Sequence, residues 1–143
     1  GGETMNAKQY LRRIRFLDKT ISAKLEQIMV HRSLAAKVTS VLQEGPQFHS
    51  GYYEDRLANI VAEIVNLEEQ LQKDLEEYIN LKRKVIMQIN SMEDGRLKLV
   101  LYHRYLNQKT WEDIACDLNC STQWVHTLHG QALQEFDKIL EVS

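Results

Sequence analysis

The amino-acid sequence predicts an all-α protein in which a long antiparallel helical hairpin, a coiled coil, precedes a smaller helical domain. The chain has six glycines and one proline among 143 residues, which disfavours a turn-dense β-sheet protein. Apolar residues recur every three or four positions over residues 10–42 and again over 57–89. From residue 91 onward turn-forming residues become denser, which is typical of shorter helices. The predicted domains are therefore a hairpin at 5–90 and a second helical domain at 91–143.

The first predicted helix is unusually long. At ~1.5 Å per residue the segment 10–42 would extend for about 50 Å, which is typical of a coiled coil. No glycine or proline interrupts its apolar stripe, which consists of Leu11, Ile14, Leu17, Ile21, Leu25, Ile28, Ala35, Val38 and Leu42.

A single strong breaker separates the first helix from the second. The segment 43–51 holds Gly45, Pro46 and Gly51, with Phe48 and His49 between them. The second stripe consists of Leu57, Ile60, Ile64, Leu67, Leu71, Leu75, Tyr78, Leu81, Val85 and Ile89. Two such helices bury their stripes most simply against each other, so an antiparallel hairpin is predicted.

The charge distribution also favours pairing of the two long helices. The formal net charge of the whole chain is −2. Residues 1–44 carry eight basic and four acidic groups, whereas residues 45–90 carry five basic and eight acidic groups. Opposite charges favour contact between the helices, although each exposed pair contributes well under ~1 kcal/mol.

Three shorter helices are predicted after residue 91, roughly at 96–106, 111–118 and 122–141. Thr110 and Asp113 have the spacing of a capping box, and Ser121 is a natural N-cap for the last helix. The last two helices are joined by the short turn Asn119-Cys120-Ser121. Their facing apolar positions are Trp111, Ile114, Ala115 and Leu118 on one helix, and Val125, Leu128, Ala132, Leu133 and Phe136 on the other. This pattern predicts a helix-turn-helix, in which the second helix enters the major groove of DNA.

These residues resemble region four of bacterial sigma factors. The resemblance rests on Arg104-Tyr105-Leu106, Thr110-Trp111-Glu112-Asp113-Ile114-Ala115, Leu118, Ser121, Val125 and Ala132-Leu133. The whole chain is similar to a small family from phages and prophages of Gram-positive bacteria, grouped with ArpU-type and RinA-type late-gene transcriptional regulators. The resemblance therefore implies a DNA-binding transcription regulator of phage or prophage type.

The resemblance also implies where DNA would be contacted. The base-reading positions fall on Thr122, Gln123 and Thr127, while His126 and Gln131 lie near the phosphates. Lys109, just before the first motif helix, is expected to touch a backbone phosphate. The expected partners are double-stranded DNA, RNA polymerase and, through the hairpin, a second copy of the chain. No cofactor and no metal are expected.

One feature of the predicted reading helix departs from the region-four pattern. Residues 122–131 contain no arginine or lysine, and residues 91–143 carry five basic and eight acidic groups. Phosphate contacts normally supply much of the affinity for DNA. The alternative is therefore a protein-interaction module, such as an RNA polymerase or sigma-like adaptor, that has lost autonomous DNA binding.

The basic residues of the chain are concentrated elsewhere. Lys8, Arg12, Arg15 and Lys19 fall on one helical face by their spacing, opposite the apolar stripe. This face is either a solvated outer surface of the coiled coil, which is the favoured interpretation, or a contact for flanking DNA or an acidic surface of polymerase.

Other chemistries find little support in the sequence. Cys116, Cys120, His126 and His129 invite a zinc interpretation, but the two histidines project about 60° apart on one helix while Val125 must face the core. Trp111 is expected in the core. Trp124 is expected either to pack against the preceding helix or to contact the DNA backbone. Without a catalytic motif, a secretory signal or a membrane-length apolar run, a cytoplasmic non-enzyme is expected, with no membrane partner.

Overall fold

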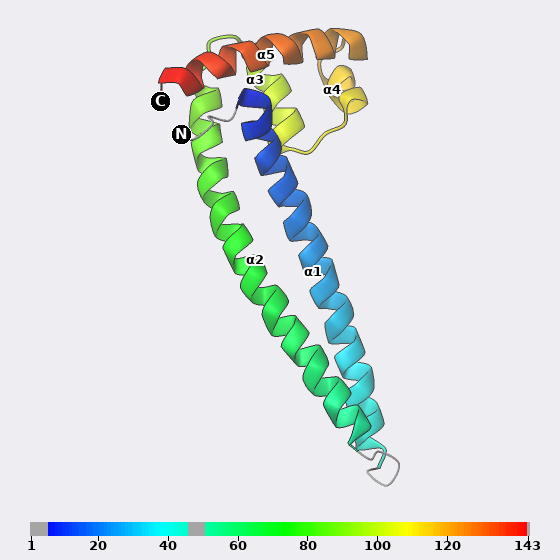
Figure 1. The fold of residues 1–143 in the computed structure, drawn as a ribbon. Helices are drawn as coiled ribbons and strands as arrows, with labels where there is room; N and C mark the ends of the chain where they lie inside the picture. Colours follow the sequence, from blue (N-terminus) through cyan, green and yellow to red (C-terminus); the bar gives the residue numbers. More distant parts are fainter. Residues whose placement is uncertain (1–5, 46–50, 143) are drawn as a thin grey trace. The chain divides into compact units, whose positions relative to one another are not determined.

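The computed structural model describes residues 6–45 and 51–142. All regular elements in these two ranges are helical, and the two long helices run antiparallel (Figure 1). In order they are α1 (Ala7–Gln43), α2 (Tyr52–Asn90), α3 (Gly95–Leu101), the π-helical turn η2 (Tyr102–Leu106), α4 (Trp111–Asp117) and α5 (Thr122–Val142). The predicted fold class, two long antiparallel helices followed by shorter ones, is confirmed. Met5 and the predicted breaker residues 46–50 lie outside the described ranges.

The chain forms two compact units whose boundaries cross both long helices. We call Gly1–Asp18 with Tyr78–Ser143 the composite unit, and Lys19–Glu77 the hairpin unit. This division differs from the predicted one between residues 90 and 91. The physical reason is a shared core, because apolar residues from the start of α1 and the end of α2 pack with those of α3, α4 and α5. The members from the two long helices are Ala7, Leu11, Ile14, Val85 and Ile89.

Within the hairpin unit, α1 and α2 pair through a narrow apolar seam and cross-helix ion pairs. Its buried apolar residues are Ile21, Ile28, Ile60 and Leu71. The ion pairs join Lys24 to Asp74 at 2.5 Å, His31 to Glu63 at 2.5 Å, and Arg32 to Glu68 at 2.8 Å. Each pair places the basic partner on α1 and the acidic partner on α2, as the opposite charges of the two segments predicted.

Within the composite unit, the first turns of α1 are attached firmly to α5 and α2. The Asn6 side chain caps α1 by accepting the Gln9 amide hydrogen at 2.9 Å. The Ala7 amide donates to Asp137 Oδ1 on α5 at 2.7 Å, which places a carboxylate at a helix N-terminus, where its charge is favoured. Tyr10 donates its hydroxyl to Gln88 Oε1 on α2 at 3.0 Å and packs its ring against Phe136.

The predicted helix at 96–106 is corrected in its second half. Asp94 caps α3 by accepting the amide hydrogens of Arg96 and Leu97. The α-helix ends at Leu101, and the chain continues as the wider turn η2. The turn is closed by the Asn107 amide donating to the Tyr102 carbonyl at 2.9 Å. A π-helical turn contains more residues than an α-helical turn, so it changes the direction in which the following side chains point. Here the adjacent residues Tyr105 and Leu106 are both buried.

No helix within residues 6–45 or 51–142 is long and apolar enough to cross a membrane.

Candidate nucleic-acid interface

The turn between α4 and α5 is defined by hydrogen bonds at both helix ends. Thr110 caps α4, its hydroxyl accepting the Asp113 amide hydrogen at 3.1 Å, and Ser121 caps α5 by accepting that of Trp124 at 3.1 Å. Both predicted caps are confirmed. Between them, Asn119 has the left-handed φ of 54°. The amides of Asn119 and Cys120 donate to the carbonyls of Cys116 and Ala115, which is a Schellman motif.

The helices α4 and α5 pack through the apolar faces that the sequence predicted. Ile114 and Ala115 on α4 are buried, as are Val125, Leu128, Ala132 and Phe136 on α5. Trp111 is partly buried against this core, and its ring lies 4.5 Å from that of His126 and 4.8 Å from that of His129 between centroids. The caps and the core together set the angle between α4 and α5.

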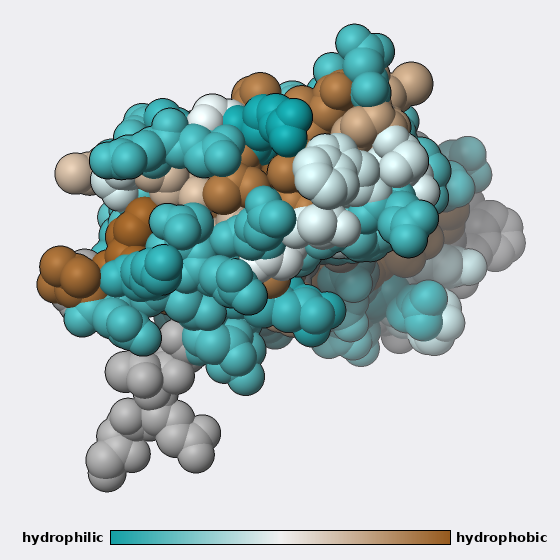
Figure 2. Space-filling model, turned by 90° about the horizontal axis from the view of Figure 1, so that it is seen from above, coloured by the Kyte–Doolittle hydropathy of each residue, from teal (hydrophilic) through white to brown (hydrophobic). Residues whose placement is uncertain are grey.

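The outer face of α5 is polar and exposed. The five α5 residues predicted to contact DNA are all exposed: Thr122, Gln123, His126, Thr127 and Gln131. Gln123 and Thr127 lie one turn apart on the same face, and the Thr127 hydroxyl donates to the Gln123 carbonyl at 3.3 Å. His126 and Gln131 project about 140° apart by helical geometry, so they lie on opposite flanks of this face. Because α5 lies at the top of Figure 1, Figure 2 looks onto it from above, and hydrophilic residues surround the smaller apolar patches there.

Lys109, predicted to touch a DNA phosphate, forms an ion pair with Asp117 in the structure. Its ammonium lies 2.5 Å from Asp117 Oδ2, and this hydrogen bond lowers the pKa of the Asp117 carboxyl below its usual value. Both side chains are substantially exposed, at 35% and 40%. An exposed pair of this kind contributes less than ~1 kcal/mol to stability.

Behind α5, a cluster of aromatic and histidine side chains supports the helix. Tyr105 and His129 are joined by a buried hydrogen bond of 2.6 Å between the hydroxyl and Nε2. Burial, assisted by the positive charges of Lys8, His126, Arg104 and Arg12, lowers the pKa of His129 to about 4. His129 is therefore neutral near pH 7 and is a packing residue. Sequence reasoning missed this pair, because no local pattern connects positions 105 and 129.

The two histidines considered for zinc have other partners in the structure. His129 binds Tyr105 and His126 packs on Trp111. Cys116 is exposed, whereas Cys120 is partly buried. Within the described part of the chain, no group of three or more potential metal ligands is present.

The structure also shows the exposure of Trp124 and the units to which the basic residues of α1 belong. Trp124 is 40% exposed, with the Arg96 guanidinium 5.9 Å from its ring centroid. Of the four residues on the predicted basic face of α1, Lys8, Arg12 and Arg15 belong to the composite unit, and Lys19 belongs to the hairpin unit.

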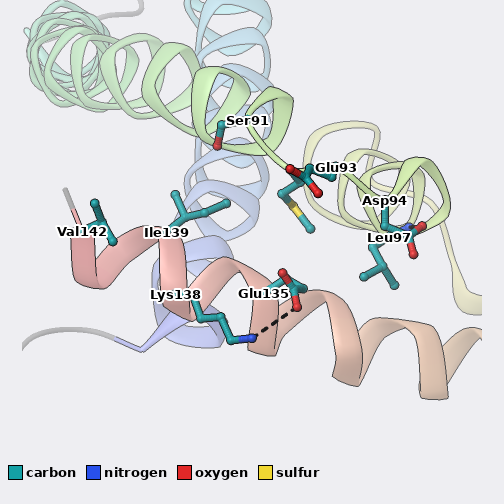
Figure 3. A pocket seen from close by; sticks show the side chains of 9 residues that line it. Ser91, Glu93, Asp94, Leu97, Glu135, Lys138, Ile139 and Val142 are labelled. Atoms are coloured by element: carbon teal, nitrogen blue, oxygen red, sulfur yellow. Dashed lines mark hydrogen bonds and ion pairs between the residues drawn. The ribbon is translucent and has the colours of Figure 1, made fainter.

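A separate groove of about 830 Å³ lies between the α2–α3 connection and the end of α5 (Figure 3). Its apolar lining comes from Met92, Leu97, Ile139 and Val142, and its polar lining from Ser91, Glu93, Asp94, Glu135 and Lys138. Lys138 contacts Glu135 at 3.5 Å. The groove thus combines apolar side chains with a mainly acidic rim.

Gly130 is an exposed glycine in the interior of α5, and a Cβ built there meets nothing within 4 Å. Since glycine disfavours helix by ~0.5–1 kcal/mol relative to alanine, Gly130→Ala is expected to raise the free energy of unfolding by that amount. Urea denaturation followed by circular dichroism measures the change. A destabilised variant would contradict the open surroundings of Gly130.

Comparison with known proteins identifies a family but no characterised relative. The model of the family described as protein of unknown function (DUF1492) matches residues 46–137. No curated protein and no solved structure matches the chain. The family match covers more than half of the chain and includes α2, α3, α4 and most of α5. The chain therefore belongs to the DUF1492 family.

Proposed function

We propose that this protein is a DNA-binding transcription regulator of phage or prophage type, in which α5 reads the major groove. The supporting observation is the capped α4–α5 turn, which leaves the first turns of α5 exposed and polar while their opposite side is buried. This is the arrangement that a recognition helix needs. The resemblance of residues 104–133 to sigma region four supports the same role.

The exposed side chains suit readout of base edges. Gln123 offers both an amide donor and an acceptor, the pair that recognises adenine in the major groove, and Thr127 adds a hydroxyl and a methyl group. Thr122 lies at the first position of α5. His126 and Gln131, on the two flanks, would meet the phosphates on either side of the groove. Gly130 removes a side chain from the outer face and so permits close approach of the DNA.

Lys109 and the assembly partners complete the proposal. Lys109 would exchange its ion pair with Asp117 for a DNA phosphate. RNA polymerase and a second copy of this chain, joined through the hairpin, are the protein partners. In a dimer, the two α5 helices would contact DNA about one helical turn apart. Simultaneous binding of both would raise the overall affinity for DNA even if each single site binds weakly.

A second candidate function, protein interaction without DNA binding, is favoured by the groove in Figure 3. Its apolar lining and acidic rim suit a basic, amphipathic segment of a partner such as polymerase. The absence of arginine and lysine from residues 122–131 points the same way. The exposed polar face of α5 has no role in this alternative.

The test is selection of duplexes from a random double-stranded DNA library by the full chain at low salt, followed by fluorescence anisotropy on the selected sequence. Gln123→Ala and Thr127→Ala are each expected to weaken binding to that sequence about 5- to 150-fold, because a good base contact is worth ~1–3 kcal/mol. Binding to unrelated duplex should change little.

The matched control is Gln70→Ala, which removes an exposed glutamine side chain from α2 and should leave affinity unchanged. Failure to enrich any duplex, with or without RNA polymerase, would sink the DNA proposal and favour the protein-interaction alternative.

A further inference from the structure

We propose that the first turns of α1, together with η2, form a binding surface for the phosphate backbone of DNA beside the reading helix. Its residues are Lys8, Arg12 and Arg15 of α1 and Arg104 of η2, and we call it the phosphate surface. The inference rests on the proposed function and deepens it, since it adds the arginine and lysine contacts to phosphate that residues 122–131 of α5 cannot supply.

The α1 portion of this surface is held rigidly against α5. Leu11 and Ile14 are completely buried in the shared core, and the Ala7 amide is bound to Asp137 of α5. The basic residues follow at spacings of four and three, so they share a face. Lys8 and Arg12 are exposed, and Arg15 is partly exposed. A binding partner would therefore meet three cations on one face of a helix whose position is fixed by packing.

Arg15 and Arg104 are positioned by the segment that leads into α4. Arg15 Nε donates to Gln108 Oε1 at 3.0 Å, and Gln108 Nε2 donates to the Tyr105 carbonyl at 3.1 Å. Arg104 donates to the Lys109 carbonyl at 3.1 Å, and its guanidinium lies 4.1 Å from the centroid of the Trp111 ring. Both guanidinium groups are thus connected to the residues immediately before α4.

These cations repel one another in the absence of an anion. Burial, followed by the positive charges of Arg15 and Arg12, lowers the pKa of Arg104. The positive charges of Lys8, Arg104 and Arg12 also contribute to lowering the pKa of His129 on α5. The ion pairs found among the described residues include none of Lys8, Arg12, Arg15 and Arg104. The Glu112 carboxylate acts on the pKa of Arg104 in the opposite sense, but the group keeps a net positive charge. Such a site favours a bound anion.

The dimensions and chemistry favour a nucleic-acid backbone as that anion. Lys8 and Arg15 are seven residues apart, which is about 10 Å along the helix, or about three base steps at ~3.4 Å each. Arginine also matches phosphate with its planar fork of donors. Because residues 122–131 of α5 contain no arginine or lysine, α1 and η2 would supply the cationic contacts to phosphate while α5 reads the bases.

The test compares Arg12→Gln/Arg15→Gln with the wild-type full chain on the selected duplex and on an unrelated duplex, over a range of salt concentrations. Removal of one phosphate contact reduces the slope of log K against log salt by ~0.9, so the double variant is expected to reduce it by about 1.8 on both duplexes. The selected base sequence should stay the same. Since Arg15 makes a hydrogen bond, Lys8→Gln/Arg12→Gln serves as a second variant that breaks no hydrogen bond found in the structure.

The matched control is Arg83→Gln/Lys84→Gln, which removes two positive charges from exposed positions of α2 in the same unit. It should leave the salt slope nearly unchanged.

A wild-type slope in both α1 double variants would overturn the phosphate surface while leaving base reading by α5 intact. Loss of polymerase binding with an unchanged slope would assign the surface to an acidic protein instead, and would also overturn the proposal. If the wild-type chain selects no duplex, the proposed function and the phosphate surface fail together.

Discussion

A fragment of residues 91–143 is expected not to fold by itself, although the sequence marks it as a domain. The structure places Leu11, Ile14, Val85 and Ile89, all completely buried, in the same core as α3, α4 and α5. Removing four such side chains forfeits on the order of 10 kcal/mol of burial, which is comparable to the whole stability of a typical domain. Circular dichroism and the dispersion of amide signals in NMR spectra should show a largely unfolded chain.

A pair of substitutions in α2 tests the same core within the full chain. Ile89→Ala removes a completely buried side chain and should lower the free energy of unfolding by ~2–5 kcal/mol. Met87→Ala, two residues away, removes a side chain that is 69% exposed and should have an effect below ~1 kcal/mol. Equal effects in urea denaturation, or a cooperatively folded 91–143 fragment, would show that the ends of the long helices are not part of this unit.

The second large effect is a loss of stability in acid that originates at His129. Its pKa is lowered from 6.5 to about 4 in the folded chain, mainly by burial. Between these values the unfolded chain binds the proton and the folded chain does not, so stability falls as the pH is lowered. At 1.36 kcal/mol per pH unit, the loss approaches ~3 kcal/mol near pH 4. Above pH 6.5 this contribution is constant.

Urea denaturation at several pH values measures this loss. His129→Leu removes the titrating group, and its free energy of unfolding should therefore decline less steeply between pH 6.5 and pH 4 than that of the wild type. NMR titration of the imidazole signals gives an independent value. A midpoint for His129 above pH 6 would contradict the account of a neutral, buried imidazole bound to Tyr105.

The dependence of the composite unit on α1 affects functional experiments as well. Truncation of the first turns of α1 would remove core side chains and three of the four cations in the phosphate surface. A loss of binding in such a fragment would therefore carry no information about α5. For this reason each of the functional tests uses the full chain and replaces side chains that are exposed or partly exposed.

Local patterns were sufficient for the two long helices and for the caps of α4 and α5. The three- and four-residue spacing of apolar side chains predicted both long helices, because burial of one stripe imposes that period. Thr110 and Ser121 were recognisable because each hydroxyl satisfies an amide three residues ahead. The π-helical turn at Tyr102–Leu106 was missed, since its wider geometry depends on which side chains the surrounding core accepts.

By itself, the sequence determined the all-helical class, the antiparallel pair of long helices and an α5 face without arginine or lysine. The reason is that the period of the apolar side chains, the breaker between the two stripes and the composition of residues 122–131 can all be read locally. Only the tertiary structure decided that the start of α1 and the end of α2 share a core with α3, α4 and α5. It also placed Lys8, Arg12 and Arg15 in the same unit as Arg104. The hydrogen bonds that tie α1 into this unit join residues 78 to 130 positions apart. Burial of side chains from distant segments decides such a pairing, and no local pattern predicts it.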